Sequence, residues 1–216
     1  TPLYSSAASD VYKRQLPIRC GVRVSSVEPN GAGYLVHTHQ ATIKTSNVVI
    51  ATGLFQKPRI PTLSANLPVE VQQLHSSEYR NPAALPPGAV LVVGSAQSGG
   101  QITEELYQSG RKVYLCMSGA GRGPRRYRGQ DIVWWMDRVG FTSVTVDQLP
   151  SPKGKFAPNP LVSGKDGGRT LNPHQFARDG VVLLGRMQGV QGGKITLAPD
   201  LKESLTKSDK FQADLL

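Results

Sequence analysis

The sequence has few cysteines and no long apolar run. Only two cysteines, Cys20 and Cys116, occur among its 216 residues, and they lie far apart. Such usage excludes a disulfide scaffold, offers no paired-cysteine metal site, and is typical of a reducing compartment, so we expect a cytoplasmic protein. No stretch approaches the ~18 consecutive apolar residues of a membrane-spanning helix, and we therefore expect no membrane span.

Acidic residues are also scarce. Asp and Glu total 15 against 25 Lys and Arg, a formal net charge of +10. A basic excess of this size is one feature of nucleic-acid-binding proteins. No recognisable binding module accompanies it, so nucleic-acid binding remains an alternative and we expect no nucleic-acid partner. The sequence also lacks a Ser-His-Asp arrangement and paired carboxylates, and we assign no catalytic residue.

Residues 1–15 show neither strand nor helix periodicity and lack the apolar segment of a signal peptide. They resemble a translated sequencing-adaptor remnant, and an ordinary disordered leader is the alternative. The hydrophobic content of 38%, with 23 Gly and 16 Pro, indicates a turn-rich globular protein in the remainder. We therefore leave these 15 residues out of the fold prediction.

Alternating apolar residues after this leader predict a small antiparallel β-meander. The expected strands are Arg19–Val27, Tyr34–Thr38 and Ala41–Lys44, with a turn at Pro29–Gly33. The continuous apolar run Val48–Ala51, which ends at Thr52-Gly53, predicts a buried strand followed by a glycine turn.

Two histidines, His37 and His39, lie on one face of this meander and could ligate a metal. No cysteine or carboxylate lies close to them in the sequence. We interpret them as ordinary strand side chains and expect no metal site.

A βαβ unit of the dinucleotide-binding type follows. Ala89–Val93 predicts a strand, Ser98–Ser109 a helix that ends before Gly110, and Lys112–Met117 a second strand. The turn between the first strand and the helix has the sequence Gly94-Ser95-Ala96-Gln97-Ser98-Gly99. Further along, Val181–Gly185 predicts a buried strand, Lys194–Leu197 a short strand, and Asp200–Leu215 a helix.

The glycines of this turn have separate physical roles. Gly94 permits a tight turn, Gly99 lets the helix pack against the sheet, and the free amides of the helix N-terminus attract a pyrophosphate. Ala96 replaces the usual middle glycine and places a methyl group at the closest approach to the phosphates. We predict that residues 94–99 bind a dinucleotide; a plain structural turn is the alternative.

Basic residues follow the second strand, where an NAD site usually has an acid. Arg122, Arg125 and Arg126 occur there, and the next acid is Asp131. A guanidinium matches a ribose 2′-phosphate bidentately, so the segment favours NADP over NAD. A solvated basic loop is the alternative.

Four elements in order carry a family resemblance. Ala51-Thr52-Gly53 is followed by Pro58-Arg59-Ile60-Pro61, by Leu74–Pro82, and then by the βαβ unit. This order resembles the flavin-containing monooxygenase group, and more closely its bacterial NAD(P)/FAD-dependent oxidoreductase relatives. The resemblance runs from about Leu16 to the C-terminus.

The resemblance implies an α/β fold in which a Rossmann-like NAD(P)-binding domain is inserted within an FAD-binding domain that includes the meander. It implies FAD and NADP as cofactors, with Thr52 and Gly53 near the flavin and Val24 contacting adenine. His75 and Tyr79 would lie in the stretch that links the domains, where His75 has a capping or hinge role as an alternative. Trp134 and Trp135 would shape the cofactor cleft or pack in the core.

The resemblance also implies a longer enzyme of which this chain is the central part. Neither the N-terminal FAD fingerprint nor the C-terminal flavin-covering segment is recognisable. We expect residues 16–84 to be a partial FAD domain with its linker and residues 85–216 a C-terminally truncated NAD(P)-binding domain, inactive alone.

The implied reaction passes a hydride from NADPH to FAD and oxygen from O₂ to a small substrate with an N, S or carbonyl centre. A reductase that inserts no oxygen would share every motif and remains an alternative. The substrate and the oligomeric state cannot be assigned from the sequence.

Overall fold

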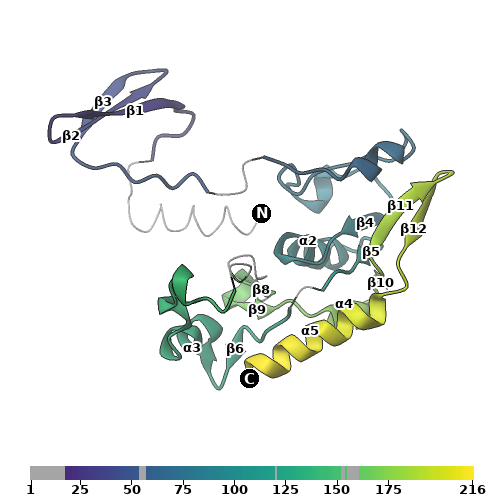
Figure 1. The fold of residues 1–216 in the computed structure, drawn as a ribbon. Coiled ribbons are helices and arrows are strands. Elements are labelled where there is room, and N and C mark those ends of the chain that lie inside the picture. The colour runs from purple at the N-terminus through teal and green to yellow at the C-terminus, as the bar shows by residue number, and fades with distance from the viewer. Residues whose placement is uncertain (1–17, 54–56, 120, 152–153, 155–160) are drawn as a thin grey trace. The chain divides into compact units, whose positions relative to one another are not determined.

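The computed structural model describes residues 18–53, 57–119, 121–151, 154 and 161–216. The predicted leader, residues 1–15, lies outside these ranges. The chain divides into two compact units, of which the first ends at Arg59 and the second covers Ile60–Leu216 (Figure 1). In the part of the chain that is described, no helix combines the length and the apolar character needed to cross a membrane.

The first unit contains the predicted meander. Its antiparallel strands are β1 (Val24–Asn30), β2 (Gly33–Thr38) and β3 (Thr42–Thr45), in the order β1-β2-β3. Strand β1 begins and ends later than predicted, because Pro29 and Asn30 pair with β2 instead of forming the turn. The turn is then only two residues long, and Gly31 supplies the positive φ of 60° that it requires.

The predicted buried strand at Val48–Ala51 is wrong. These residues form no strand, and Val49 and Ile50 are 87% and 77% exposed. An apolar strand becomes buried only when neighbouring strands and covering helices enclose it, and no strand among the described residues pairs with this segment. The residues described in the first unit include no buried side chain, so the meander has no core of its own there.

The predicted βαβ unit organises the second unit. Strands β4 (Val90–Val93), β5 (Val113–Cys116) and β10 (Val182–Leu184) form a parallel sheet in the order β10-β5-β4. This third-second-first order is that of one half of a Rossmann fold. The α/β fold class is therefore confirmed, although β10 is half-buried instead of fully buried.

Helix α2 (Gln97–Gln108) connects β4 to β5 and contacts both strands (Figure 1). It ends where predicted because Gly110 adopts φ of +83°. The Gly110 amide then donates to the Tyr107 carbonyl at 3.0 Å and the Arg111 amide to the Leu106 carbonyl at 3.1 Å. These two bonds satisfy carbonyls that the helix end would otherwise leave unpaired.

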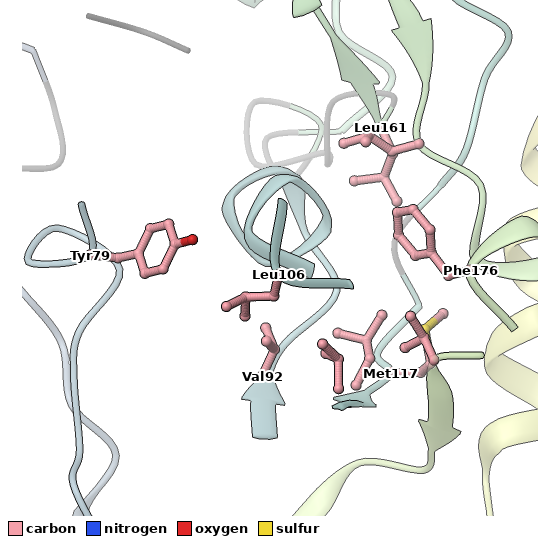
Figure 2. Close-up of a cluster of buried hydrophobic side chains, with 10 residues drawn as sticks. Tyr79, Val92, Leu106, Met117, Leu161 and Phe176 are labelled. Carbon is pink, nitrogen blue, oxygen red and sulfur yellow. The ribbon is translucent and has the colours of Figure 1, made fainter. Parts of the chain in front are cut away.

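A hydrophobic core fills the space between the sheet and its helices (Figure 2). Leu106, Leu115, Met117 and Leu171 are completely inaccessible to solvent. Full burial of such a side chain contributes about 1.5–3 kcal/mol. Leu201 and Leu205 of helix α5 (Leu201–Leu215) pack against the same cluster, so this core fixes the last helix to the βαβ unit.

Short elements complete the second unit. Three two-stranded pairs are antiparallel: β6 with β7, β8 with β9, and β11 with β12. Helix α5 and strand β12 (Lys194–Leu197) occur where the sequence predicts them. The bounds are η1 (Thr62–Asn66), η2 (Pro82–Ala84), β6 (Arg126–Tyr127), β7 (Gln130–Asp131), α3 (Ile132–Arg138), η3 (Phe141–Ser143), η4 (Val146–Gln148), β8 (Val162–Ser163), η6 (Lys165–Gly167), β9 (Arg169–Thr170), α4 (Pro173–Arg178), β11 (Met187–Gln191) and β12 (Lys194–Leu197).

Candidate functional site

Two glycines shape the turn between β4 and α2. Gly94 has φ of +102°, a conformation that residues with a side chain rarely adopt. A Cβ atom at Gly99 would overlap the carbonyl oxygen of Gly94. The chain can therefore leave the sheet and enter the helix within this short distance only because both residues are glycine.

The N-terminus of α2 has no side-chain cap. Ala96 is the N-cap residue, with φ of −71° and ψ of −173°, and the first turn contains no acidic residue. The helix begins with the bond from the Gly100 amide to the Ala96 carbonyl at 2.8 Å. The amides of Gln97, Ser98 and Gly99 precede this bond and have no intrahelical acceptor. Their donors, together with the positive end of the helix dipole, form a site suited to an anion.

Two side chains of this turn have structural partners. Ser95 is buried, and its hydroxyl donates to the Ser118 carbonyl and accepts from the Ser118 amide, both at 2.9 Å. The Gln97 amide group donates to the Val162 carbonyl and accepts from the Val162 amide. Ser95 thus links the turn to the end of β5, and Gln97 links it to β8. Only the backbone of these two residues remains available to a ligand.

The predicted arginines have protein partners in the structure. Two guanidinium groups form ion pairs, Arg122 with Asp209 at 2.8 Å and Arg125 with Asp131 at 2.7 Å. Arg126 donates to the Gly167 carbonyl at 2.9 Å and is exposed. The role of the three guanidinium groups toward a cofactor stays a prediction.

Asp209 is the centre of a small charged cluster. Its carboxylate accepts from Arg122 and from His174 Nε2, the latter at 3.0 Å. Burial alone would raise the pKa of Asp209, but the hydrogen bonds from His174 and Arg122 outweigh it and lower this pKa. Asp131 behaves in the same way: burial opposes the ionised form, while the Val133 amide and Arg125 lower its pKa.

A cavity of about 180 Å³ lies beyond the carboxyl ends of β5 and β10. In open α/β sheets this edge is where ligands bind. Its lining includes Ser118 and Gly119 after β5, Arg186 after β10, and Asp200, Glu203 and Lys207 from α5 and its N-cap. The sequence alone does not indicate Arg186, Asp200, Glu203 or Lys207 as site residues, because they occur some 70–90 positions after β5 and belong to no motif.

The remaining predicted positions lie apart from the glycine turn along the chain. Val24, Thr52 and Gly53 belong to the first unit and are exposed; their contact with a flavin stays a prediction.

His37 contacts Thr42 at 3.0 Å, and His39 accepts from the Arg23 amide at 3.1 Å. Within the described ranges, no group of three or more His, Cys, Asp or Glu residues is placed to hold a metal ion.

The linker residues His75 and Tyr79 have different environments. The ring of His75 accepts from the Ser77 amide at 3.2 Å and thereby closes a local turn. Tyr79 is buried, and its hydroxyl donates to the Glu105 carboxylate at 3.1 Å, which attaches the linker to α2. The pKa of Tyr79 is raised, mainly because its hydroxyl is buried and to a smaller extent because of the negative charge of Glu105.

The two tryptophans do not lie in the core. Trp134 is 40% exposed, and Trp135 is half-buried with its indole nitrogen donating to the Tyr127 carbonyl at 2.8 Å. Their interpretation as core residues is wrong, because α3 buries only Ile132.

Comparison with known families decides the class of the protein. The pyridine nucleotide-disulphide oxidoreductase family matches residues 4–135, which is more than half of the chain. The chain belongs to this oxidoreductase family. The matched segment includes the whole β4-α2-β5 unit of this family member, and the predicted glycine turn therefore lies within the family match.

Individual relatives agree with the family. An uncharacterized oxidoreductase, CzcO-like, from Geobacillus kaustophilus is 38% identical over 145 residues, 67% of this chain and 40% of the relative. The flavin-containing monooxygenase FMO GS-OX-like 9 of Arabidopsis thaliana is 37% identical over 68 residues, 32% of this chain and 15% of the relative. A double mutant of a flavin monooxygenase from Stenotrophomonas maltophilia is 19% identical with a TM-score of 0.49, covering 90% of this chain and 50% of that structure.

The family match and the two curated relatives confirm the resemblance to flavin monooxygenase-like oxidoreductases. The chain spans 40% or less of the length of the two curated relatives.

Proposed function

We propose that the β4-α2-β5 unit binds the pyrophosphate of a nicotinamide dinucleotide. The observation that carries this proposal is the turn itself: Gly94 at positive φ, Gly99 without room for a Cβ, and an uncapped helix N-terminus without a nearby acid. Each feature brings backbone donors close to an anion or removes a group that would repel it. Membership of a pyridine nucleotide oxidoreductase family supports the same ligand.

We further propose NADP as this dinucleotide and FAD as the second cofactor. The basic segment that follows β5 contains Arg122, Arg125 and Arg126, and a guanidinium is the side chain that best matches a 2′-phosphate. For the flavin, Val24, Thr52 and Gly53 remain the proposed contacts. In this proposal residues 16–84 belong to the FAD-binding part and residues 85–216 to the NADP-binding part. The two cysteines, both free thiols, agree with the cytoplasmic location that we propose.

The complete enzyme would be an NADPH- and FAD-dependent monooxygenase acting with O₂ on a small N-, S- or carbonyl-containing substrate. A bound flavin would supply the electron transfer between the nicotinamide and O₂. The residues of this chain would bind and orient the dinucleotide. The relative named as a flavin-containing monooxygenase supports oxygen insertion over simple reduction.

Calorimetric titration of the 216-residue chain with NADPH and with NADH tests the first step. We expect saturable binding of both dinucleotides, with a lower dissociation constant for NADPH. A preference for NADH would refute the assignment of NADP, and binding of neither would refute the dinucleotide site. In the full-length enzyme, oxygen uptake matched by oxygenated product supports the monooxygenase, whereas NADPH oxidation that yields only H₂O₂ supports the reductase.

A further inference from the structure

The cavity at the end of β5 lies directly beside the glycine turn. Ser118 lines the cavity, and the Ser95 hydroxyl holds both the amide and the carbonyl of Ser118 at 2.9 Å. A dinucleotide whose pyrophosphate lies at the N-terminus of α2 continues into its adenine-side ribose through one methylene group. The sugar would therefore reach this cavity, whose far wall is helix α5.

Lys207 reaches across this cavity from α5. Its Cδ atom lies 3.7 Å from the position that a Cβ of Gly119 would occupy, so the lysine stem runs along the backbone after β5. The Lys207 ammonium contacts the Glu203 carboxylate at 2.6 Å, one helical turn earlier. Both side chains are more than 60% exposed, and exposed pairs of this kind are weak. Exchanging Glu203 for a phosphate as the partner of the Lys207 ammonium therefore costs little free energy.

Two other cations near this edge, Arg186 and Arg122, are held more firmly. Arg186 is bound to Asp200 through its amide at 2.9 Å and its guanidinium at 2.7 Å, and the Asp200 side chain is only 15% exposed. Arg122 is likewise held by Asp209, which His174 also contacts. Of the cations that line the cavity, Lys207 is thus the one with the more exposed partner.

We propose that Lys207 binds the ribose 2′-phosphate and that Glu203 opposes it, so this pair sets the choice between NADPH and NADH. The inference rests on the proposed dinucleotide site. With NADPH, the Lys207 ammonium donates to the phosphate while the Glu203 carboxylate repels it. With NADH, Glu203 instead accepts from the 2′-hydroxyl, as an acid near this position does in NAD sites.

Dissociation constants of the full chain for NADPH and NADH, measured at one ionic strength, test the pair. Lys207→Gln should weaken NADPH about tenfold to hundredfold, the range of one hydrogen bond to a charged group, and leave NADH unchanged. Glu203→Gln should tighten NADPH and weaken NADH. Lys202→Gln is the matched control: it removes the same charge from an exposed position of α5, about 140° around the helix from Lys207, and should affect both dinucleotides equally and slightly.

The charge-reversed double variant Glu203→Lys with Lys207→Glu keeps an i,i+4 pair on the helix but removes the acid from its first turn, so its thermal denaturation is measured beside its NADPH preference to separate lost binding from lost helix stability. If Lys207→Gln changes NADPH binding no more than Lys202→Gln does, the inference is wrong. Should Arg126→Gln produce the loss instead, the arginine segment holds the phosphate. A wild-type chain that binds neither dinucleotide refutes the proposed function, whereas a chain that binds both without response to these variants refutes only the role of the pair.

Discussion

An aspartate at position 98 should stabilise the protein and at the same time weaken dinucleotide binding. Ser98 is an exposed residue in the first turn of α2, which contains no acid. A carboxylate there interacts favourably with the helix dipole, so Ser98→Asp should raise the free energy of unfolding by about 0.3–1 kcal/mol. A structural turn without a ligand predicts this gain and nothing more.

The same carboxylate would face the bound pyrophosphate. Two unit charges about 4 Å apart interact with about 1 kcal/mol in a water-like dielectric. With two charges on the pyrophosphate, the loss is about 2 kcal/mol, which corresponds to roughly a 30-fold higher dissociation constant. The two effects have opposite signs because the ligand and the new side chain compete for the same amides.

Thermal denaturation and calorimetric titration of the same samples separate the two effects. Ser98→Asn, which has nearly the same shape as aspartate but no charge, is the control and should bind NADPH about as well as the wild-type chain. If Ser98→Asp is as stable as expected and binds NADPH with unchanged affinity, the phosphates do not lie at this helix end.

Three further results are expected. Gly99→Ala should lower the free energy of unfolding by about 1–3 kcal/mol through the overlap of its Cβ with backbone, whereas Gly164→Ala, with open space around its Cβ and φ of −85°, should leave denaturation almost unchanged. Ala96→Gly should lower the dissociation constant for NADPH several-fold in titrations without lowering stability, since glycine is the better N-cap residue. Asp209→Asn should lower the melting temperature at pH 7, because the carboxylate has a lowered pKa in the folded state. Its stabilising contribution is present above the unfolded pKa of about 4 and is lost as pH falls through the folded pKa, so a difference that persists undiminished at low pH would contradict this pairing.

The sequence predicts the βαβ unit well because its signals are local. Gly94, Gly99 and Gly110 each satisfy a backbone requirement within a few residues of themselves, at a tight turn, a close contact and a helix end. Strand β4 ends directly before Gly94, and strand β5 begins three residues after Gly110. No information from elsewhere in the chain is needed to place these elements.

The failures concern distant partners. Val48–Ala51 has the composition of a buried strand, but burial depends on neighbouring strands that the segment itself does not encode. Arg122 appears in the sequence as a free cation, yet its partner Asp209 lies 87 residues away. The sequence does not indicate Glu203 and Lys207 as site residues for the same reason, because only the packing of α5 brings them to the end of β5.

Backbone amide resonances of the isotopically labelled chain provide the most direct test of the central proposal, that the N-terminus of α2 binds a nicotinamide dinucleotide. On addition of NADPH, we expect saturable chemical-shift changes that are largest at the amides of Gln97, Ser98 and Gly99 and extend to Ser118. Absence of any change, or changes confined to residues outside the turn and the end of β5, would contradict it.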